Sequence, residues 1–169
     1  EVLNYGTKPD DEDTDGDGLN DGAEVGLHGT NPLDSDTDGD MLNDGLEINT
    51  YISDPLDKDT DGDELEDYNE TAVHNTSPTS TDTDGDGLTD EQEFSSGTDG
   101  SRYDTDEDGL GDDKELELST NPTKPDSDGD QLSDGDEYTK HKTNPTKNDT
   151  DGDGISDYAE LEGHDVTFL

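Results

Sequence analysis

The sequence contains no cysteine, so neither a disulfide framework nor a zinc–thiolate site can stabilise the chain. Its four histidines form none of the H-x-x-H or H-E-x-x-H pairs that zinc enzymes use. No apolar run approaches the roughly 20 residues that a helix needs to span a bilayer. Disulfide scaffolds, common zinc sites and transmembrane helices are therefore excluded as the organising feature of this sequence.

Apolar side chains are scarce as well. They make up 20% of the sequence, aromatic residues make up 5%, and the mean hydropathy is −1.30. Such a composition is typical of disordered chains. The 169 residues are enough for one domain, but they cannot build one large hydrophobic core. Another source of folding free energy is required, and bound metal is that source in other small metal-dependent modules.

Basic residues are also rare: 8 lysines and arginines stand against 52 aspartates and glutamates, which gives a net charge of −44. This charge repels a phosphate backbone, so nucleic acid is excluded as a partner. An acid-rich chain is ordinarily a solvated or disordered surface. Here most of the acids instead recur at fixed positions, and a merely solvated surface needs no such spacing.

The acids are organised by a twelve-residue motif, which Asp149–Glu160 (DTDGDGISDYAE) illustrates. Acids occupy places one, three, five, nine and twelve of this motif, and glycine occupies place six. In a loop that wraps a cation, alternating acids, the backbone carbonyl of place seven and a closing glutamate at place twelve supply the oxygen ligands. Calcium suits such a loop better than magnesium, because calcium accepts six to eight oxygens in flexible geometry.

The motif occurs seven times, and loops 1 to 7 begin at Asp13, Asp36, Asp59, Asp82, Asp104, Asp126 and Asp149. The steps between them are 23, 23, 23, 22, 22 and 23 residues, and all five acidic places are filled in every copy. We therefore expect at least seven bound Ca²⁺ ions. The predicted metal-binding residues, including the place-seven residues that offer a carbonyl, are Asp13, Asp15, Asp17, Leu19, Asp21 and Glu24; Asp36, Asp38, Asp40, Leu42, Asp44 and Glu47; Asp59, Asp61, Asp63, Leu65, Asp67 and Glu70; Asp82, Asp84, Asp86, Leu88, Asp90 and Glu93; Asp104, Asp106, Asp108, Leu110, Asp112 and Glu115; Asp126, Asp128, Asp130, Leu132, Asp134 and Glu137; and Asp149, Asp151, Asp153, Ile155, Asp157 and Glu160.

A fixed period of this length indicates stacked units, each of which contacts only its neighbours. The predicted fold is mostly irregular loop with short helical turns, in a linear, calcium-stabilised tandem array without a large single core. Glu1 is in phase with a place-twelve glutamate, so we expect the sequence to be a window from a longer array. The predicted segments are the end of a preceding repeat at 1–12 and repeats 1 to 7 at 13–35, 36–58, 59–81, 82–103, 104–125, 126–148 and 149–169, the last with a partial linker.

Within each repeat we expect a helical turn that begins near place nine and a linker that contains proline, whose fixed φ ends the helix. Apolar residues recur at place seven and directly after the closing glutamate. These two positions predict a thin hydrophobic seam between stacked repeats. The residues after the closing glutamate are Val25, Ile48, Phe94, Leu116, Tyr138 and Leu161, with Thr71 as the exception.

The motif D-x-D-x-D-G-L-x-D-x-x-E followed by T-N-P resembles the thrombospondin type 3 repeat in its cysteine-free bacterial and archaeal form. The resemblance covers essentially the whole chain. It implies a non-globular row of calcium-wrapped loops, as found in extracellular stalks, adhesins and surface proteins. It also assigns the ligand roles, place by place, to the 35 acids of the seven loops.

Two departures from other calcium loops bear on the sites. EF-hands and dockerins carry an apolar residue at place eight, where this chain has polar residues or glycine, which argues against a paired EF-hand domain. Place six is usually glycine because the backbone there often needs a positive φ. In three loops it is Met41, Glu64 or Gln131, so we expect these sites to be strained or weaker.

The favoured function is a calcium-stiffened stalk or spacer of an extracellular or cell-surface protein. Without metal the five carboxylates of each loop repel one another, and with metal the loop closes. The alternative is a calcium-dependent, self-assembling filament or layer subunit, in which surplus carboxylates share calcium with neighbouring copies. Adaptation to high salt is disfavoured, because halophilic acids would scatter over the surface. No nucleophile–base pair, phosphate loop or open catalytic metal site indicates an enzyme.

Overall fold

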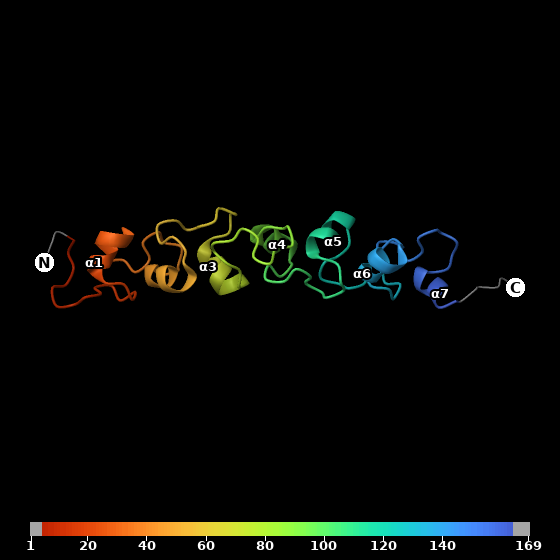
Figure 1. The fold of residues 1–169 in the computed structure, drawn as a ribbon, viewed down its shortest axis with the longest axis horizontal. Helices are drawn as coiled ribbons and strands as arrows, with labels where there is room; N and C mark the ends of the chain where they lie inside the picture. The colour runs from red at the N-terminus through yellow and green to blue at the C-terminus, as the bar shows by residue number, and fades with distance from the viewer. Residues whose placement is uncertain (1–4, 164–169) are drawn as a thin grey trace. The chain divides into compact units, whose positions relative to one another are not determined.

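The computed structural model describes residues 5–163, and Glu1 lies outside this part. The chain divides into two compact units, the first reaching Thr83 and including 89–91, the second formed by 84–88 and the chain from Gln92 onward. Within each unit the repeats follow one another in chain order (Figure 1). The described residues contain short helices and no strand, so the predicted tandem array of loops and helical turns is confirmed. None of these helices is long and apolar enough to cross a membrane.

Every α-helix of the described residues begins at the place-nine aspartate of a loop, as predicted. An acid in this position is favourable because the N-terminus of a helix carries partial positive charge. Place eight caps several of the helices: the side chains of Asn20, Asn43, Ser133 and Ser156 accept a backbone N–H of the first turn. The polar residue at place eight therefore acts as the N-cap of these helices. The α-helices are α1 Asp21–Ala23, α2 Asp44–Leu46, α3 Asp67–Asn69, α4 Asp90–Ser96, α5 Asp112–Leu118, α6 Asp134–Asp136 and α7 Asp157–Leu161.

The one-residue difference between the 22- and 23-residue steps is absorbed inside the helices. Repeats 1, 2, 3 and 6 continue their α-helix as a π-helix, whereas repeats 4 and 5 have only α4 and α5. A π-turn holds one residue more than an α-turn. In repeat 2, for example, the N–H of Ile52 donates to the carbonyl of Glu47, five residues earlier (2.6 Å). The π-helices are η1 Glu24–His28, η2 Glu47–Tyr51, η3 Glu70–His74 and η4 Glu137–His141.

Hydrophobic packing is thin. The large apolar side chains buried in the described part of the chain are five place-seven leucines, so this half of the predicted seam is confirmed. The other half is wrong at Phe94, Leu116, Tyr138 and Leu161, which are exposed, whereas Val25 and Ile48 are half-buried. The closing glutamate itself points inward, and the next residue of a helix is turned about 100° away from it. Linker prolines are buried instead, at Pro32, Pro55, Pro78, Pro122 and Pro145.

Candidate metal centres

Each loop folds around its own place-one aspartate. In loop 2, Asp36 Oδ1 accepts the N–H of Gly39 (2.8 Å), and its Oδ2 accepts the N–H of Met41 (3.1 Å). The N–H of Asp40 donates to Asp38 (3.1 Å), and that of Leu42 donates to Asp40 (2.6 Å). These bonds recur in loops 1, 3, 5, 6 and 7. They hold the three alternating carboxylates toward the inside of the loop.

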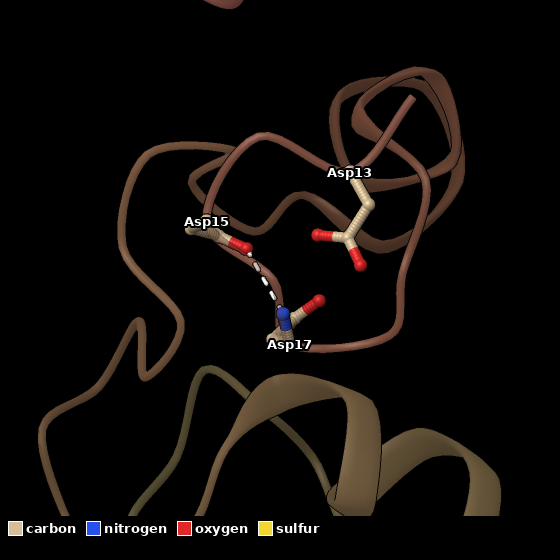
Figure 2. A group of neighbouring side chains, drawn as sticks. All are labelled: Asp13, Asp15 and Asp17. Atoms are coloured by element: carbon tan, nitrogen blue, oxygen red, sulfur yellow. Dashed lines mark hydrogen bonds between the residues drawn. The ribbon is translucent and has the colours of Figure 1, made fainter. Parts of the chain in front are cut away.

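Figure 2 shows the carboxylates of Asp13, Asp15 and Asp17 converging on the space that loop 1 encloses. One oxygen of each lies within 4.8 Å of the others. Asp36, Asp38 and Asp40 form the same group in loop 2, and so do Asp59, Asp61 and Asp63 in loop 3. Calcium binds oxygens at 2.3–2.6 Å, so two ligands of one ion are separated by up to about 5 Å. The spacing of these oxygens therefore fits a calcium ion between them.

The closing glutamates of loops 1 to 6 are 0% exposed. In loops 1, 2 and 5, one oxygen of this carboxylate accepts a hydrogen bond from a linker hydroxyl, such as Thr30 Oγ1 to Glu24 Oε1 (3.3 Å). The other oxygen, Oε2, has no hydrogen-bond partner in Glu24, Glu47 and Glu115. The Oδ2 atoms of the place-three aspartates Asp15, Asp38, Asp61, Asp106 and Asp128 are likewise buried without a partner. A buried carboxylate oxygen that lacks a donor is costly unless the group binds a cation or takes up a proton.

The interior of the described repeats is acidic. Sixteen buried side chains are aspartates or glutamates, against five buried leucines, and the six largest fully buried side chains are glutamates. Ion pairs to lysine and arginine lie at the surface and use acids outside the five ligand places: Lys8–Asp11, Arg102–Glu107, Lys114–Glu117 and Lys140–Asp136. Buried charges are stable only when they are paired or coordinate a metal.

The closing glutamates hold their protons unusually tightly in the absence of metal. Burial raises the pKa of Glu24 to about 7, that of Glu47 to about 8 and that of Glu70 to about 9. Repulsion from the place-three and place-five aspartates of the same loop is the second cause of these raised pKa values. Near neutral pH, protons therefore compete with any cation for these oxygens.

The place-nine aspartate was predicted to act on the ion of its own loop. Both of its oxygens bind place two there: Asp44 Oδ1 accepts the N–H of Thr37 (2.7 Å), and Oδ2 accepts its hydroxyl (2.6 Å). One oxygen of Asp44 also lies within 4.8 Å of ligand atoms of Asp17 and Glu24 in loop 1. Asp44 thus fixes its own loop and faces the candidate metal site of loop 1.

The sequence analysis overlooked the hydroxyl residue at place two. Its hydroxyl donates to place nine in loops 1 to 5 and 7, and it accepts an N–H from the linker, as in Asn31 N–H to Thr37 Oγ1 (2.9 Å). The linker bond is present in all seven repeats. The available signal was regular: place two is threonine or serine in every loop, namely Thr14, Thr37, Thr60, Thr83, Thr105, Ser127 and Thr150.

Place six adopts a positive φ, as its usual glycine indicated. The value is 99° at Gly18 and 97° at Gly109. Met41, Glu64 and Gln131 keep the same conformation, with φ of 89°, 83° and 91°. An L-residue is strained in this region. The predicted strain at these three sites is present, and their weaker affinity stays a prediction.

The family model described as bacterial TSP3 repeat matches six segments: 13–35, 36–58, 82–99, 104–125, 126–148 and 149–164. Repeat 3 (59–81) is not among them, although its loop groups its aspartates as loops 1 and 2 do. The match confirms the resemblance to thrombospondin type 3 repeats.

Two solved structures are similar to parts of the chain. One is described as "Biofilm associated protein - B domain", with 44% identity over 27% of this chain and 11% of that one. The other, "Biofilm associated protein - BSP domain", has 45% identity over 26% and 8%. The TM-score of 0.26 in both cases does not establish a common overall fold. The comparison with curated proteins found no match.

Proposed function

The chain belongs to the bacterial TSP3 repeat family, and from this premise we propose that it is a calcium-binding structural array with at least one Ca²⁺ ion per loop. The observation that carries the proposal is the set of buried, partnerless oxygens at places three and twelve. Bound calcium supplies the positive charge and oxygen coordination that these groups lack. Places one, three, five and twelve would hold the ion with their side chains, and place seven with its carbonyl.

In this proposal, different groups of the chain orient the carboxylates that bind the ion. The N–H groups of places four and six orient the place-one carboxylate, and the linker hydroxyl orients the closing glutamate. Metal binding then contributes folding free energy directly, because the unfolded chain holds no such arrangement. Seven closed loops in sequence would make a spacer whose stiffness depends on calcium.

A location outside the cell or on its surface follows from the expected affinity. Extracellular calcium modules bind with dissociation constants of roughly 0.1–1 mM. Sites of that strength are filled in calcium-rich surroundings and empty in a cytosol. An oxygen cage saturated by the protein leaves no position for a substrate, which supports a structural role over an enzymatic one.

Small-angle scattering of residues 1–169 in millimolar calcium, in chelator and in equimolar magnesium tests the spacer function. We expect a single well-defined particle in calcium and an expanded ensemble in chelator, with magnesium giving little recovery. An unchanged scattering curve in chelator contradicts the proposal. Sedimentation of the same samples identifies the alternative, since a spacer stays monomeric and a filament or layer subunit associates when calcium is added.

A further inference from the structure

The place-five aspartate of loops 2 to 6 is held by two repeats at once. In loop 2, Asp40 Oδ1 accepts the N–H of Leu42 in its own loop, and Oδ2 accepts the N–H of Tyr68 in repeat 3 (3.0 Å). Tyr68 occupies place ten, the second residue of α3. The first four N–H groups of a helix have no acceptor within the helix, so this donor is available. The same bond joins Asp63 to Glu91, Asp86 to Asp113, Asp108 to Gly135 and Asp130 to Tyr158, at 2.7–3.0 Å.

The backbone of the following helix lies very close to this aspartate in two repeats. A Cβ atom added to Gly45 would lie 2.1 Å from the carbonyl oxygen of Asp17. At Gly135 it would lie 2.5 Å from the carbonyl oxygen of Asp108. Glycine at place ten permits this approach, because any side chain would displace the helix from the preceding loop. The start of one repeat thus packs directly on the ligand residue of the one before.

The following repeat also covers the closing glutamate. Asp44 of repeat 2 shares an acidic group with Asp17 and Glu24 of loop 1, and all three side chains are buried. Loop 7, which no repeat follows in this sequence, gives the comparison: its place-five Asp153 and its closing Glu160 are exposed. In loops 1 to 6, which a repeat follows, the closing glutamate is fully buried and the place-five aspartate is buried or half-buried.

We propose that each calcium site is a two-repeat site: the loop supplies the main ligands, and the place-nine carboxylate and place-ten N–H of the next repeat complete it. The place-ten residue is a positioning residue, because it acts through the place-five aspartate. This inference rests on the proposed calcium binding, and it adds that each site includes groups of the next repeat. By linkage, calcium in one loop and the helix of the next repeat stabilise each other.

The test removes the N–H of place ten and retains everything else that the helix needs. Tyr68→Pro deletes the donor, and proline is tolerated in the first turn of a helix. Tyr68→Ala also removes the phenol ring but keeps the N–H, so it is the matched control. Calcium chloride is titrated into the full chain and followed by ¹H–¹⁵N NMR. The reporters are the amides of Met41 in loop 2 and Glu64 in loop 3, each of which donates to the place-one carboxylate of its loop.

We expect Tyr68→Pro to raise the calcium dissociation constant of loop 2 roughly tenfold, because a hydrogen bond to a charged group is lost. The constant of loop 3 should change less, and Tyr68→Ala should leave both nearly unchanged. A larger effect on loop 3, or equal effects on both loops, overturns the inference and assigns the change to local damage in α3. Failure of the unmodified loops to bind calcium overturns the proposed function itself.

If Tyr68→Pro unfolds repeat 3, the same test can be made at the boundary between repeats 6 and 7. Tyr158 donates to Asp130 of loop 6 in the same way (2.9 Å). Tyr158→Pro should weaken loop 6, reported by the amide of Gln131, more than loop 7, reported by Gly154, with Tyr158→Ala as control. The opposite order at this boundary rejects the two-repeat site.

Discussion

At the scale of single residues, the closing glutamate shows why we propose that this chain binds a cation. It is the bulkiest group in the interior, one of its oxygens has no donor in three of the loops, and its neighbours are other carboxylates. Without metal such a group is retained in the fold only by taking up a proton. Its position was predictable from spacing, because place twelve follows the alternating aspartates at a fixed distance. Its complete burial was not, since the sequence does not show which residues cover it.

Glu47→Gln tests this role with little change in side-chain size. The substitution removes one negative ligand and bidentate closure, so calcium binding to loop 2 should weaken by roughly tenfold or more. The control is Glu66→Gln, which removes an exposed acid at place eight of loop 3. In a calorimetric titration, Glu47→Gln should have one site fewer than the unmodified chain that binds calcium with the original affinity. The control should keep all of these sites. Equal titrations for both variants contradict the assignment.

The raised pKa values predict opposite pH dependences with and without calcium. The pKa of Glu47 rises from its ordinary 4.5 to about 8, so the metal-free fold binds more protons than the unfolded chain between these values. Its stability should be greatest below about pH 4.5 and be lost as the pH rises to about 8.

Calcium binding should follow the reverse trend, with its dissociation constant increasing as the pH falls from 8 toward 5, since protons occupy the ligands. Circular dichroism in chelator and calcium titrations over this range measure the two trends. A metal-free chain that is equally folded at pH 5 and pH 8 speaks against the buried glutamates as the cause.

At the scale of elements, loop, helix and linker form one unit through place two and place nine. The sequence correctly placed each helix start at place nine, because acid and cap residues recur there. The π-helices were not predictable, since the sequence does not show whether the extra residue of a 23-residue step lies in the linker or in the helix. Place two was overlooked because threonine is common at surfaces, and only its contacts with the linker and place nine show its role.

Thr37→Val keeps the shape of the side chain but should destabilise repeat 2. It removes the hydroxyl that accepts the linker N–H of Asn31 and donates to Asp44. Leaving the buried Asp44 carboxylate without this donor costs about 1–3 kcal/mol. Thr50→Val, at an exposed position of η2, makes the same chemical change without these contacts. Urea unfolding in saturating calcium compares them, and a loss at Thr50 as large as that at Thr37 excludes the proposed role.

Met41→Gly should strengthen loop 2. Methionine at φ 89° carries strain of about 1–2 kcal/mol that glycine does not. If this strain arises only when the loop closes, its removal should raise the calcium affinity up to about tenfold. The reciprocal change, Gly18→Met, should weaken loop 1 in the same loop-resolved titration. An affinity that does not respond to either change removes backbone strain as a determinant of site strength.

At the scale of the whole molecule, we propose calcium as the source of stability, because the described residues form no large core and the chain has few basic residues. The fold class was predictable, since seven copies at a fixed period and scarce apolar residues permit little else. The division into two compact units was not, and neither were the hydrogen bonds from place five to place ten. These bonds join residues 27 or 28 positions apart, such as Asp108 and Gly135, and no local sequence pattern reports such a pairing.

The most direct test of this account is a calcium titration of the chelator-treated chain in which bound ions and helical circular dichroism are measured together. The account predicts that at least seven ions bind and that the helical signal appears as they do. Molar potassium chloride without calcium should not restore it, because screening leaves the buried carboxylates without a ligand. A full helical signal in chelator, or its recovery in potassium chloride alone, contradicts calcium as the source of folding free energy.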